Sequence, residues 1–264
     1  MRRDDLRATF DSSAAAYHGA RPRYPVELFD ALDEYAGAAS AAEVLEIGPG
    51  TGIATIPLAE RGHRVTAIEI GERLSARARA NTAGLGGVSI VHGSFDDWEP
   101  SRWGMFDRVV AATAWHWLDP ATKYVRAHRH LRPLGTLAFW SALHVVPDDG
   151  DTFFADIQPV YDEIGESLPA DHTFPRPGEL ADHTDEIVAS GLFNQVHVRH
   201  FDWAISYDAD GYIALLETFS GHISMDRWKR DRLYGEIRQR LDRRPDRRLR
   251  RHWGAALHLA RRMP

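Results

Sequence analysis

The sequence predicts an α/β fold built on a mostly parallel β-sheet with helices on both faces. Between residues 41 and 147, short apolar runs alternate with segments of helical period, an order that is typical of a parallel sheet. The chain has 264 residues, of which 44% are hydrophobic and 27% charged, a globular composition. Because this length can bury a large core without metal or disulfides, we expect one domain over residues 1–264.

The elements of the first part follow at regular spacing. Apolar residues at three-residue spacing after Pro25 predict a helix over 26–38. The expected strands are 43–47, 64–68, 88–91, 106–111 and 135–141, and the helices between them are 53–61, 72–81 and 119–131.

After residue 146 helical periods dominate the pattern. The expected helices are 151–168, 179–190, 209–219 and 226–243, with a loop at 169–178, a strand at 196–201 and a last apolar run at 255–260. The arginine-rich stretch 243–251 is interpreted as an exposed loop.

A glycine-rich turn carries the first functional signal. It reads Glu46-Ile47-Gly48-Pro49-Gly50-Thr51-Gly52, between an expected strand and an expected helix, where glycine allows close approach of a ligand. A dinucleotide fingerprint needs glycine where this chain has Ile53, and no Gly-Lys-Ser/Thr follows as in a phosphate-binding loop. Glu46 repels a pyrophosphate and attracts an ammonium group, whereas Glu69 suits the two hydroxyls of a ribose. Both carboxylates fit S-adenosylmethionine, a nucleoside that carries an amino acid.

Four segments in this order resemble the class I S-adenosylmethionine-dependent methyltransferases, over most of residues 40–146. They are Val44 to Gly52, Glu69-Ile70, His92 to Asp97 and Phe106 to Thr113. The resemblance implies a Rossmann-like sheet, mostly parallel with an antiparallel C-terminal strand. Ser94 stands where the family commonly has an aspartate that meets the adenine amino group, and Asp96 or the backbone of Phe95 is the alternative contact.

The ends of the chain are similar to small-molecule methyltransferases of the trans-aconitate type. The similar segments are Phe10-Asp11, Tyr17, Arg21 to Pro25, Ala114 to Leu118 and Phe219 to His222. The resemblance implies cofactor-covering N-terminal helices over 1–40, a cofactor-binding core over 41–147, a helical lid insert over 148–186, and C-terminal strands and helices over 187–264. The implied cofactor-binding residues are Tyr17, Arg21, Glu46, Gly48, Gly50, Glu69, Ile70, Ser94, Phe95 and Ala112.

Two histidines are candidates for a general base, which methyl transfer requires only if the acceptor must lose a proton. His116 lies between Trp115 and Trp117, after the fourth strand, at the sheet edge where ligands bind in such folds. A turn-capping role is the alternative for His116, and His222 is the second candidate. The pairs His128/His130 and His197/His200 lack nearby carboxylates at ligand spacing and no His-Glu-x-x-His occurs, so no metal site is expected.

Composition excludes several other functions. The absence of cysteine removes disulfides, thiolate zinc sites and thiol-adduct methylation of pyrimidine carbons. The net charge of −6 argues against a nucleic-acid partner, although residues 226–262 hold 14 Lys or Arg against 5 Asp or Glu. No secretory segment or membrane-length apolar run is seen, so a cytoplasmic protein without a membrane partner is expected.

The expected function is methyl transfer from S-adenosylmethionine to a small, partly apolar organic acceptor by in-line displacement. An RNA or DNA methyltransferase that uses the arginine-rich C-terminal region is the first alternative. A non-methylating S-adenosylmethionine-binding protein and a cyclase are the others.

Overall fold

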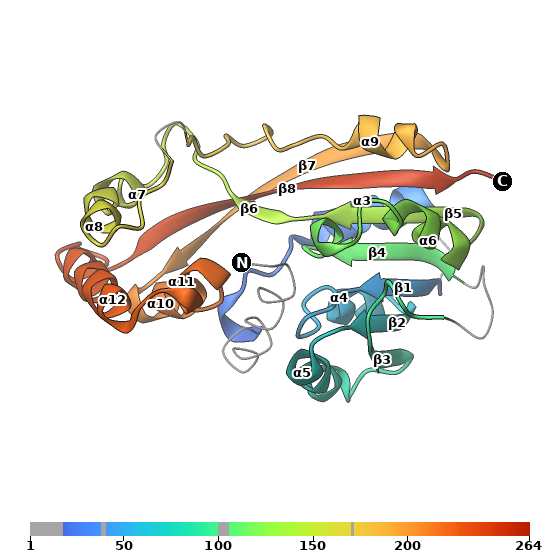
Figure 1. Cartoon of the computed structure of the whole chain (residues 1–264), viewed down its shortest axis with the longest axis horizontal. Coiled ribbons are helices and arrows are strands. Elements are labelled where there is room, and N and C mark those ends of the chain that lie inside the picture. Colours follow the sequence, from blue (N-terminus) through green and yellow to red (C-terminus); the bar gives the residue numbers. More distant parts are fainter. Residues whose placement is uncertain (1–17, 38–40, 100–105, 170–171) are drawn as a thin grey trace.

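A computed structural model describes residues 18–37, 41–99, 106–169 and 172–264. Its centre is an eight-stranded sheet in the order β3-β2-β1-β4-β5-β8-β6, with β7 on the other side of β8 (Figure 1). Five strands are mutually parallel: β1 (Glu43–Ile47), β2 (Arg64–Glu69), β3 (Val88–His92), β4 (Phe106–Ala112) and β5 (Leu131–Trp140). The predicted α/β class with a mostly parallel sheet is therefore confirmed.

Three strands form the antiparallel part of the sheet: β6 (Ala142–His144), β7 (Phe193–Tyr207) and β8 (Leu249–Arg262). The strand β6 continues the line of β5, because both pair with the same side of β8. The strands β7 and β8 run together as a long ribbon that reaches from the parallel sheet to the helical end of the molecule (Figure 1). The sequence pattern showed only the middle of this ribbon, at 196–201 and 255–260.

Helices cover both faces of the sheet. One face packs against α3 (Val26–Ala36) and α4 (Thr55–Glu60), and the other against α6 (Lys123–His130) and α9 (Thr184–Ala189). The helix α5 (Glu72–Thr82) packs against β2 and β3. The central strands β1 and β4 are almost continuously buried, which explains why they appear in the sequence as apolar runs without alternation.

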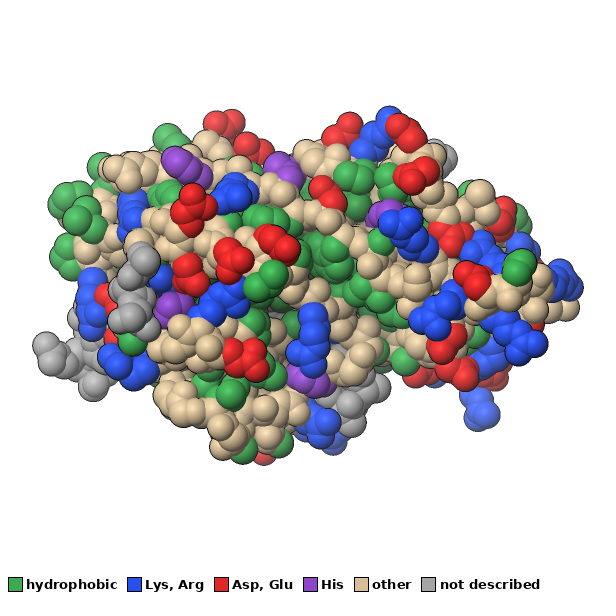
Figure 2. Space-filling model, turned by 180° about the vertical axis from the view of Figure 1, so that it is seen from behind, with side chains coloured by type: hydrophobic (Ala, Val, Ile, Leu, Met, Phe, Trp, Pro, Cys, Tyr) green, Lys and Arg blue, Asp and Glu red, His purple; other side chains and the backbone are tan. Residues whose placement is uncertain are grey.

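The remaining helices pack around the far end of the ribbon. They are α7 (Phe153–Asp156), α8 (Gln158–Glu163), α10 (Ala209–Leu216), α11 (Ser220–Ser224) and α12 (Arg227–Asp242). On α12 the residues Leu233, Ile237 and Leu241 recur at four-residue spacing and form its buried stripe. At this end of the molecule Lys and Arg side chains are interleaved with Asp and Glu (Figure 2). No helix in the described ranges is long and apolar enough to cross a membrane.

Four segments were predicted wrongly. The expected helix 151–168 is two short helices, α7 and α8, and helix 179–190 shortens to α9. The strand β5 begins at Leu131, and an irregularity in its pairing with β4 includes Leu134 at φ +62°. The stretch 243–251 is not wholly an exposed loop, because β8 begins at Leu249 and Arg251 is buried. Its side chain lies on the face of β8 that the helices cover, a long-range arrangement that local composition does not encode.

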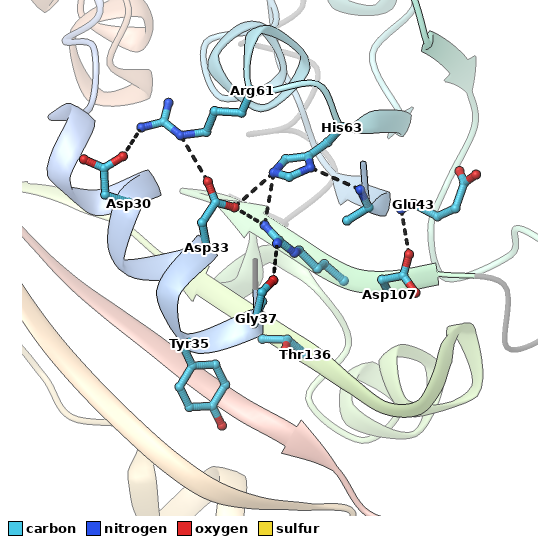
Figure 3. Close-up of polar contacts among 12 residues, drawn as sticks. Asp30, Asp33, Tyr35, Gly37, Glu43, Arg61, His63, Asp107 and Thr136 are labelled. Atoms are coloured by element: carbon cyan, nitrogen blue, oxygen red, sulfur yellow. Dashed lines mark hydrogen bonds and ion pairs between the residues drawn. The ribbon is translucent and has the colours of Figure 1, made fainter. Parts of the chain in front are cut away.

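A polar network closes the sheet at the amino-terminal edge of the strands (Figure 3). Arg108 on β4 forms an ion pair with Asp33 on α3, and His63 lies beside the pair with Nε2 at 3.0 Å from an Asp33 oxygen and 3.2 Å from an Arg108 nitrogen. The backbone N–H of Ala42 donates to Nδ1 of His63 at 3.2 Å, which leaves the ring proton on Nε2 for Asp33. Burial alone raises the pKa of Asp33, but the hydrogen bond and charge of Arg108 outweigh it and hold that pKa below its ordinary value.

Candidate active site

The glycine-rich turn lies between β1 and α4, at the carboxyl edge of the sheet. Its three glycines, Gly48, Gly50 and Gly52, have φ values of +64°, +59° and +92°, which L-residues with side chains rarely adopt. A Cβ added at Gly48 would lie 2.7 Å from the Cβ of Ala114. Glycine is therefore required at Gly48 both by its conformation and by the approach of the segment after β4.

Glu46 is fully buried at the end of β1, beneath the turn. Its Oε2 accepts a hydrogen bond of 2.6 Å from the Thr55 hydroxyl, while Oε1 has no partner among the described residues. Burial, followed by the charge of Glu69, raises the pKa of Glu46 to about 7. A small cavity of about 60 Å³ borders Glu46, Gly48 and Gly50. A buried carboxylate oxygen beside a cavity is suited to a cationic or hydrogen-bond-donating ligand.

Glu69 ends β2 on the opposite side of the turn. One carboxylate oxygen accepts from the backbone N–H of Gly50 at 2.9 Å, and the other accepts from Gly71 at 2.8 Å. These two bonds, one to each oxygen, fix the orientation of the carboxylate. Glu69 therefore ties the glycine turn to the next strand while its carboxylate lines the main cavity.

The main cavity has a volume of about 560 Å³ and runs along the carboxyl edge of the strands. It brings together most of the residues that the sequence predicted: Arg21, Gly48, Gly50, Glu69, Ile70, Ser94, Phe95 and His116. Glu46 and Ala112 line the small neighbouring cavity. Tyr17 lies outside the described residues. His222 lines neither cavity.

Asp96 adds a polar group to the end of the cavity near β3. Its Oδ1 is buried and has no hydrogen-bond partner within the described part of the chain, whereas its backbone N–H donates to the Ser94 hydroxyl at 3.2 Å. Ile70 offers an exposed apolar side chain on the same cavity wall. This end can therefore hold a flat group against Ile70 and accept a hydrogen bond at Asp96.

Thr113, directly after β4, has a left-handed backbone conformation, which is rare for a residue other than glycine. Its φ is +56°, and three hydrogen bonds hold it: its N–H donates to the Trp140 carbonyl, and its Oγ1 contacts the Tyr24 hydroxyl at 2.9 Å and the Ala142 N–H at 3.3 Å. Backbone strain in a β-branched residue persists only where the surroundings impose it, and it concentrates at functional sites. Thr113 lines both cavities.

Aromatic rings form the wall at the β5 side of the cavity. Trp115 stacks on Phe139 with ring centroids 4.9 Å apart, and Phe139 stacks on His258 at 4.8 Å. Nearby, Lys123 forms an ion pair of 2.7 Å with Glu186. The sequence analysis did not find Lys123, Phe139 or His258 as site residues. The apolar run at the carboxyl end of β5 and the apolar run around His258 in β8 were the available signal, but the pairing of Phe139 with His258 depends on strand order.

The two candidate bases differ in their surroundings. His116 lies on the 3₁₀ turn η1 (Trp115–Trp117), is exposed and faces the cavity. His222 lies on α11 with Nε2 at 2.9 Å from the Tyr161 hydroxyl. Burial, followed by the charge of Arg251, lowers the pKa of His222 to about 4. His222 reaches the cavity only through Phe219, a neighbour whose ring lines the wall.

The two parts of the segment expected as a lid, 148–186, lie in different surroundings. Its helices α7 and α8 contribute to the helical core around α10 and α12. Among its described residues, Leu180, Ala181 and His183 in the last part line the cavity.

The sequence matches the methyltransferase domain family over residues 45–139. An uncharacterized methyltransferase of Mycobacterium tuberculosis is 32% identical over 208 residues, which cover 75% of this chain and 79% of that protein. The ribosomal RNA small subunit methyltransferase A of Deinococcus radiodurans is 36% identical over 104 residues, 36% of this chain and 35% of that protein. A methyltransferase structure from Anaeromyxobacter dehalogenans has a TM-score of 0.65 and 24% identity, over 91% of this chain and 97% of that one.

A parallel sheet whose carboxyl edge holds a glycine turn between two acidic residues defines a Rossmann-like, nucleoside-binding protein. With the relatives above, the chain belongs to the class I S-adenosylmethionine-dependent methyltransferases. It is an enzyme that uses S-adenosylmethionine and transfers its methyl group to an acceptor.

Proposed function

We propose that the protein methylates a small, partly apolar organic molecule. The observation that carries this proposal is the single cavity of about 560 Å³ that extends from Glu69 to the aromatic wall at Trp115, Phe139 and Phe219. A cavity of this size is in the range of small-molecule sites and holds a cofactor together with a compact acceptor. Most of its wall beyond the glycine turn is apolar, which favours an acceptor with apolar surface.

The residues present fit S-adenosylmethionine. Oε1 of Glu46, which has no partner among the described residues, and the small cavity that Glu46 shares with Gly48 and Gly50 suit the amino-acid end. Glu69 is the proposed partner of the ribose hydroxyls. Asp96 Oδ1, which has no partner among the described residues, is the proposed acceptor for the adenine amino group, next to Ile70. The further proposed contacts are Arg21 to the methionine carboxylate, and Gly50, Ser94, Phe95, Ala112 and Tyr17 around the cofactor.

The chain itself contributes alignment and exclusion of water. When bound, S-adenosylmethionine supplies a methyl group on a sulfonium, an electrophile that needs no activation by the protein. The aromatic wall excludes water, and the strained Thr113 fixes the segment that separates the glycine turn from β6. His116, exposed on the cavity wall, is the proposed base for an acceptor that must lose a proton.

Nucleic acid is the second candidate acceptor, favoured by the partial match to a ribosomal RNA methyltransferase and by the arginines of α12. The arginines give it little support, because carboxylates of the same chain occupy several of them. Arg232 contacts Glu163 at 2.7 Å, and Arg238 contacts Asp210 at 3.1 Å. We therefore retain the small-molecule acceptor as the proposal.

Incubation with S-adenosylmethionine and a panel of phenols, carboxylic acids and cell extract tests the proposal, with S-adenosylhomocysteine followed by mass spectrometry. We expect product formation with a small molecule in the panel or in the low-molecular-mass fraction of the extract. Formation only with the RNA fraction would contradict it.

For His116→Ala we expect a kcat at least about 100-fold lower with an acceptor that loses a proton, since general-base catalysis contributes about 10²–10⁴-fold. The dissociation constant of S-adenosylhomocysteine should stay within twofold of the wild-type value. Full activity of His116→Ala would leave the residue with a structural role only, and Trp117→Phe serves as the control for local packing.

A further inference from the structure

Lys123 is a buried cation on the wall of the main cavity. It is the first residue of α6 and is 7% exposed, although the dipole of a helix disfavours a positive charge at this end. Its Nζ lies 5.4 Å from the ring centre of Trp115 and 5.2 Å from that of Tyr124. The chain has only two lysines, Lys123 and Lys229, among 32 basic residues. At this position lysine supplies a compact ammonium group with three hydrogen-bond donors.

Glu186 on α9 fixes the position of the ammonium group. Its Oε1 pairs with Lys123 Nζ at 2.7 Å, and its Oε2 lies 3.2 Å from Nδ1 of His183. Burial raises the pKa of Glu186, but the hydrogen bonds and charges of Lys123 and His183 outweigh it and hold that pKa below its ordinary value. Glu186 is therefore ionised at pH 7 and uses one of the three N–H groups of Lys123.

His183 brings a hydrogen-bond acceptor to the same end of the cavity. Its Nδ1 faces the Glu186 carboxylate, which accepts a hydrogen bond only when Nδ1 carries the proton, so Nε2 of the neutral ring is an acceptor. The ring stands at 61° to that of Phe139 and at 63° to that of His258, with centroids 5.9 Å and 5.1 Å away. His183, Phe139, His258 and Lys123 all line the cavity. One carboxylate therefore holds a donor and an acceptor beside the aromatic wall.

The end of the cavity at Lys123 has no net positive charge. The charge of Lys123 is balanced by that of Glu186, and the Asp182 carboxylate lies 3.9 Å from Nε2 of His258. Burial lowers the pKa of His258 to about 4, which keeps its ring neutral at pH 7. Both ring nitrogens of His258 lie within hydrogen-bond distance of backbone groups, at 3.0 Å and 3.1 Å. An anion is therefore not attracted to this end, whereas an uncharged hydroxyl meets both a donor and an acceptor.

We propose that Lys123 and His183 bind a hydroxyl group of the methyl acceptor, and that the acceptor is an uncharged aromatic molecule of the phenol class. This inference rests on the proposed function. The acceptor ring packs on the wall of Trp115 and Phe139, while its hydroxyl accepts from Lys123 and donates to His183. His116 remains the proposed base at the atom that receives the methyl group, so this hydroxyl is a second polar group of the acceptor. Lys123 and His183 are thus specificity residues, and the carboxylate between them is a positioning group.

Binding of three matched ligands tests the proposal. Wild-type protein saturated with S-adenosylhomocysteine is titrated at pH 7 and constant ionic strength with 4-ethylphenol, 4-ethyltoluene and 4-ethylbenzoate. Dissociation constants are taken from the amide chemical shifts in NMR spectra. We expect the phenol to bind tighter than the other two, although transfer from water favours the hydrocarbon. Binding of the phenol that is no tighter than that of the hydrocarbon overturns the hydroxyl site, and tighter binding of the benzoate overturns the uncharged acceptor.

The two lysines provide a matched pair of variants. Lys229 pairs with Glu166 at 2.7 Å and lies 5.9 Å from the ring centre of Trp228, but it does not line the cavity. Lys123→Met should weaken binding of 4-ethylphenol at least about tenfold, the loss typical of a hydrogen bond to a charged donor, and leave that of 4-ethyltoluene within about twofold. Lys229→Met should leave both affinities unchanged. Equal losses for the phenol and the hydrocarbon in Lys123→Met, or the same losses in both variants, would show that Lys123 acts only through the fold.

Glu186→Gln keeps the shape of the side chain and removes the charge that balances Lys123. This end of the cavity then gains one unit of positive charge, so the affinity for 4-ethylbenzoate should rise relative to that for 4-ethylphenol. An ion pair that only joins α6 to α9 does not produce this shift, and an unchanged preference overturns the proposal even if Lys123→Met does not fold. If S-adenosylhomocysteine itself does not bind, the proposed function fails. If it binds and the hydroxyl gives no preference, only the inference about Lys123 fails.

Discussion

At the scale of single residues, Glu46 links cofactor binding to pH. Burial, followed by the charge of Glu69, raises its pKa to about 7 in the ligand-free protein. An ammonium group against Glu46 favours the ionised form, so binding of S-adenosylhomocysteine, which has the same amino-acid end, should release a proton below pH 7. We expect its affinity to fall up to about tenfold for each pH unit below the pKa of Glu46. Calorimetric titrations in two buffers of different ionisation enthalpy measure both quantities.

The variant Glu46→Gln supplies the control, because the amide keeps the shape and does not titrate. It should release no proton and bind with an affinity that does not change with pH. In the ligand-free wild-type protein the protonated form of Glu46 stabilises the fold, because Glu46 ionises near pH 4.5 in the unfolded chain and near pH 7 in the folded chain. The stability that this proton provides is complete below pH 4.5 and is lost as pH rises to 7. Wild-type affinity that is constant from pH 5.5 to 8 would contradict the role of Glu46.

Glu69 combines a ligand-binding and a structural role. We expect Glu69→Ala to weaken S-adenosylhomocysteine binding by about 2–4 kcal/mol, since two hydrogen bonds to a charged acceptor are lost. Part of this loss comes from the N–H groups of Gly50 and Gly71, which lose their acceptor. Calorimetry measures the change, with Glu72→Ala, at an exposed acid on the adjoining helix, as the control. Unchanged affinity of Glu69→Ala would refute the assignment to the ribose.

At the scale of elements, the ion pair of Arg108 and Asp33 fastens α3 to the sheet. Arg108 is 1% exposed, and the Asp33 side chain is 28% exposed. Asp33→Ala leaves the guanidinium buried without its carboxylate, so the free energy of unfolding should fall by about 3 kcal/mol in urea titrations. Asp30→Ala removes an exposed partner of Arg61 and should change it by less than about 1 kcal/mol. Equal effects of the two substitutions would show that the buried pair adds nothing.

The elements also show what local sequence can predict. Strands β1 to β4 were found within one residue. In β1 and β4 burial on both faces leaves apolar runs. Glu46 and Glu69 were found because each stands at a strand end beside a turn whose chemistry is local. Thr113 and His258 were missed, since their roles arise from contacts with distant segments: Ala142 in one case and Phe139 in the other. The spacing of strands along the sequence does not predict which strand ends are neighbours in the sheet.

At the scale of the whole molecule, the basic C-terminal region of the chain forms ion pairs with its acidic remainder. Several basic residues of α12, and Arg244 just after it, pair with acidic residues that precede the basic region in sequence. Lys229 contacts Glu166 at 2.7 Å, and Arg238 contacts Asp210 at 3.1 Å, as Arg232 and Arg244 contact their own partners. This explains the interleaved charges at the helical end in Figure 2. Each exposed pair contributes at most about 1 kcal/mol, but together they neutralise the basic stretch locally.

This neutralisation predicts weak, non-specific binding of RNA by the whole protein. Fluorescence anisotropy with tRNA should give a dissociation constant no lower than about 10⁻⁶ M at physiological salt. A phosphate-binding surface of about six contacts would instead give a log–log salt dependence with a slope near −5. The double variant Arg243→Glu, Arg247→Glu changes two exposed arginines that have no ion pair in the described part of the chain. We expect it to leave tRNA binding within a few-fold of wild type, because these side chains are not part of a built surface. Tight, steeply salt-dependent binding that this variant abolishes would overturn the small-molecule proposal in favour of RNA.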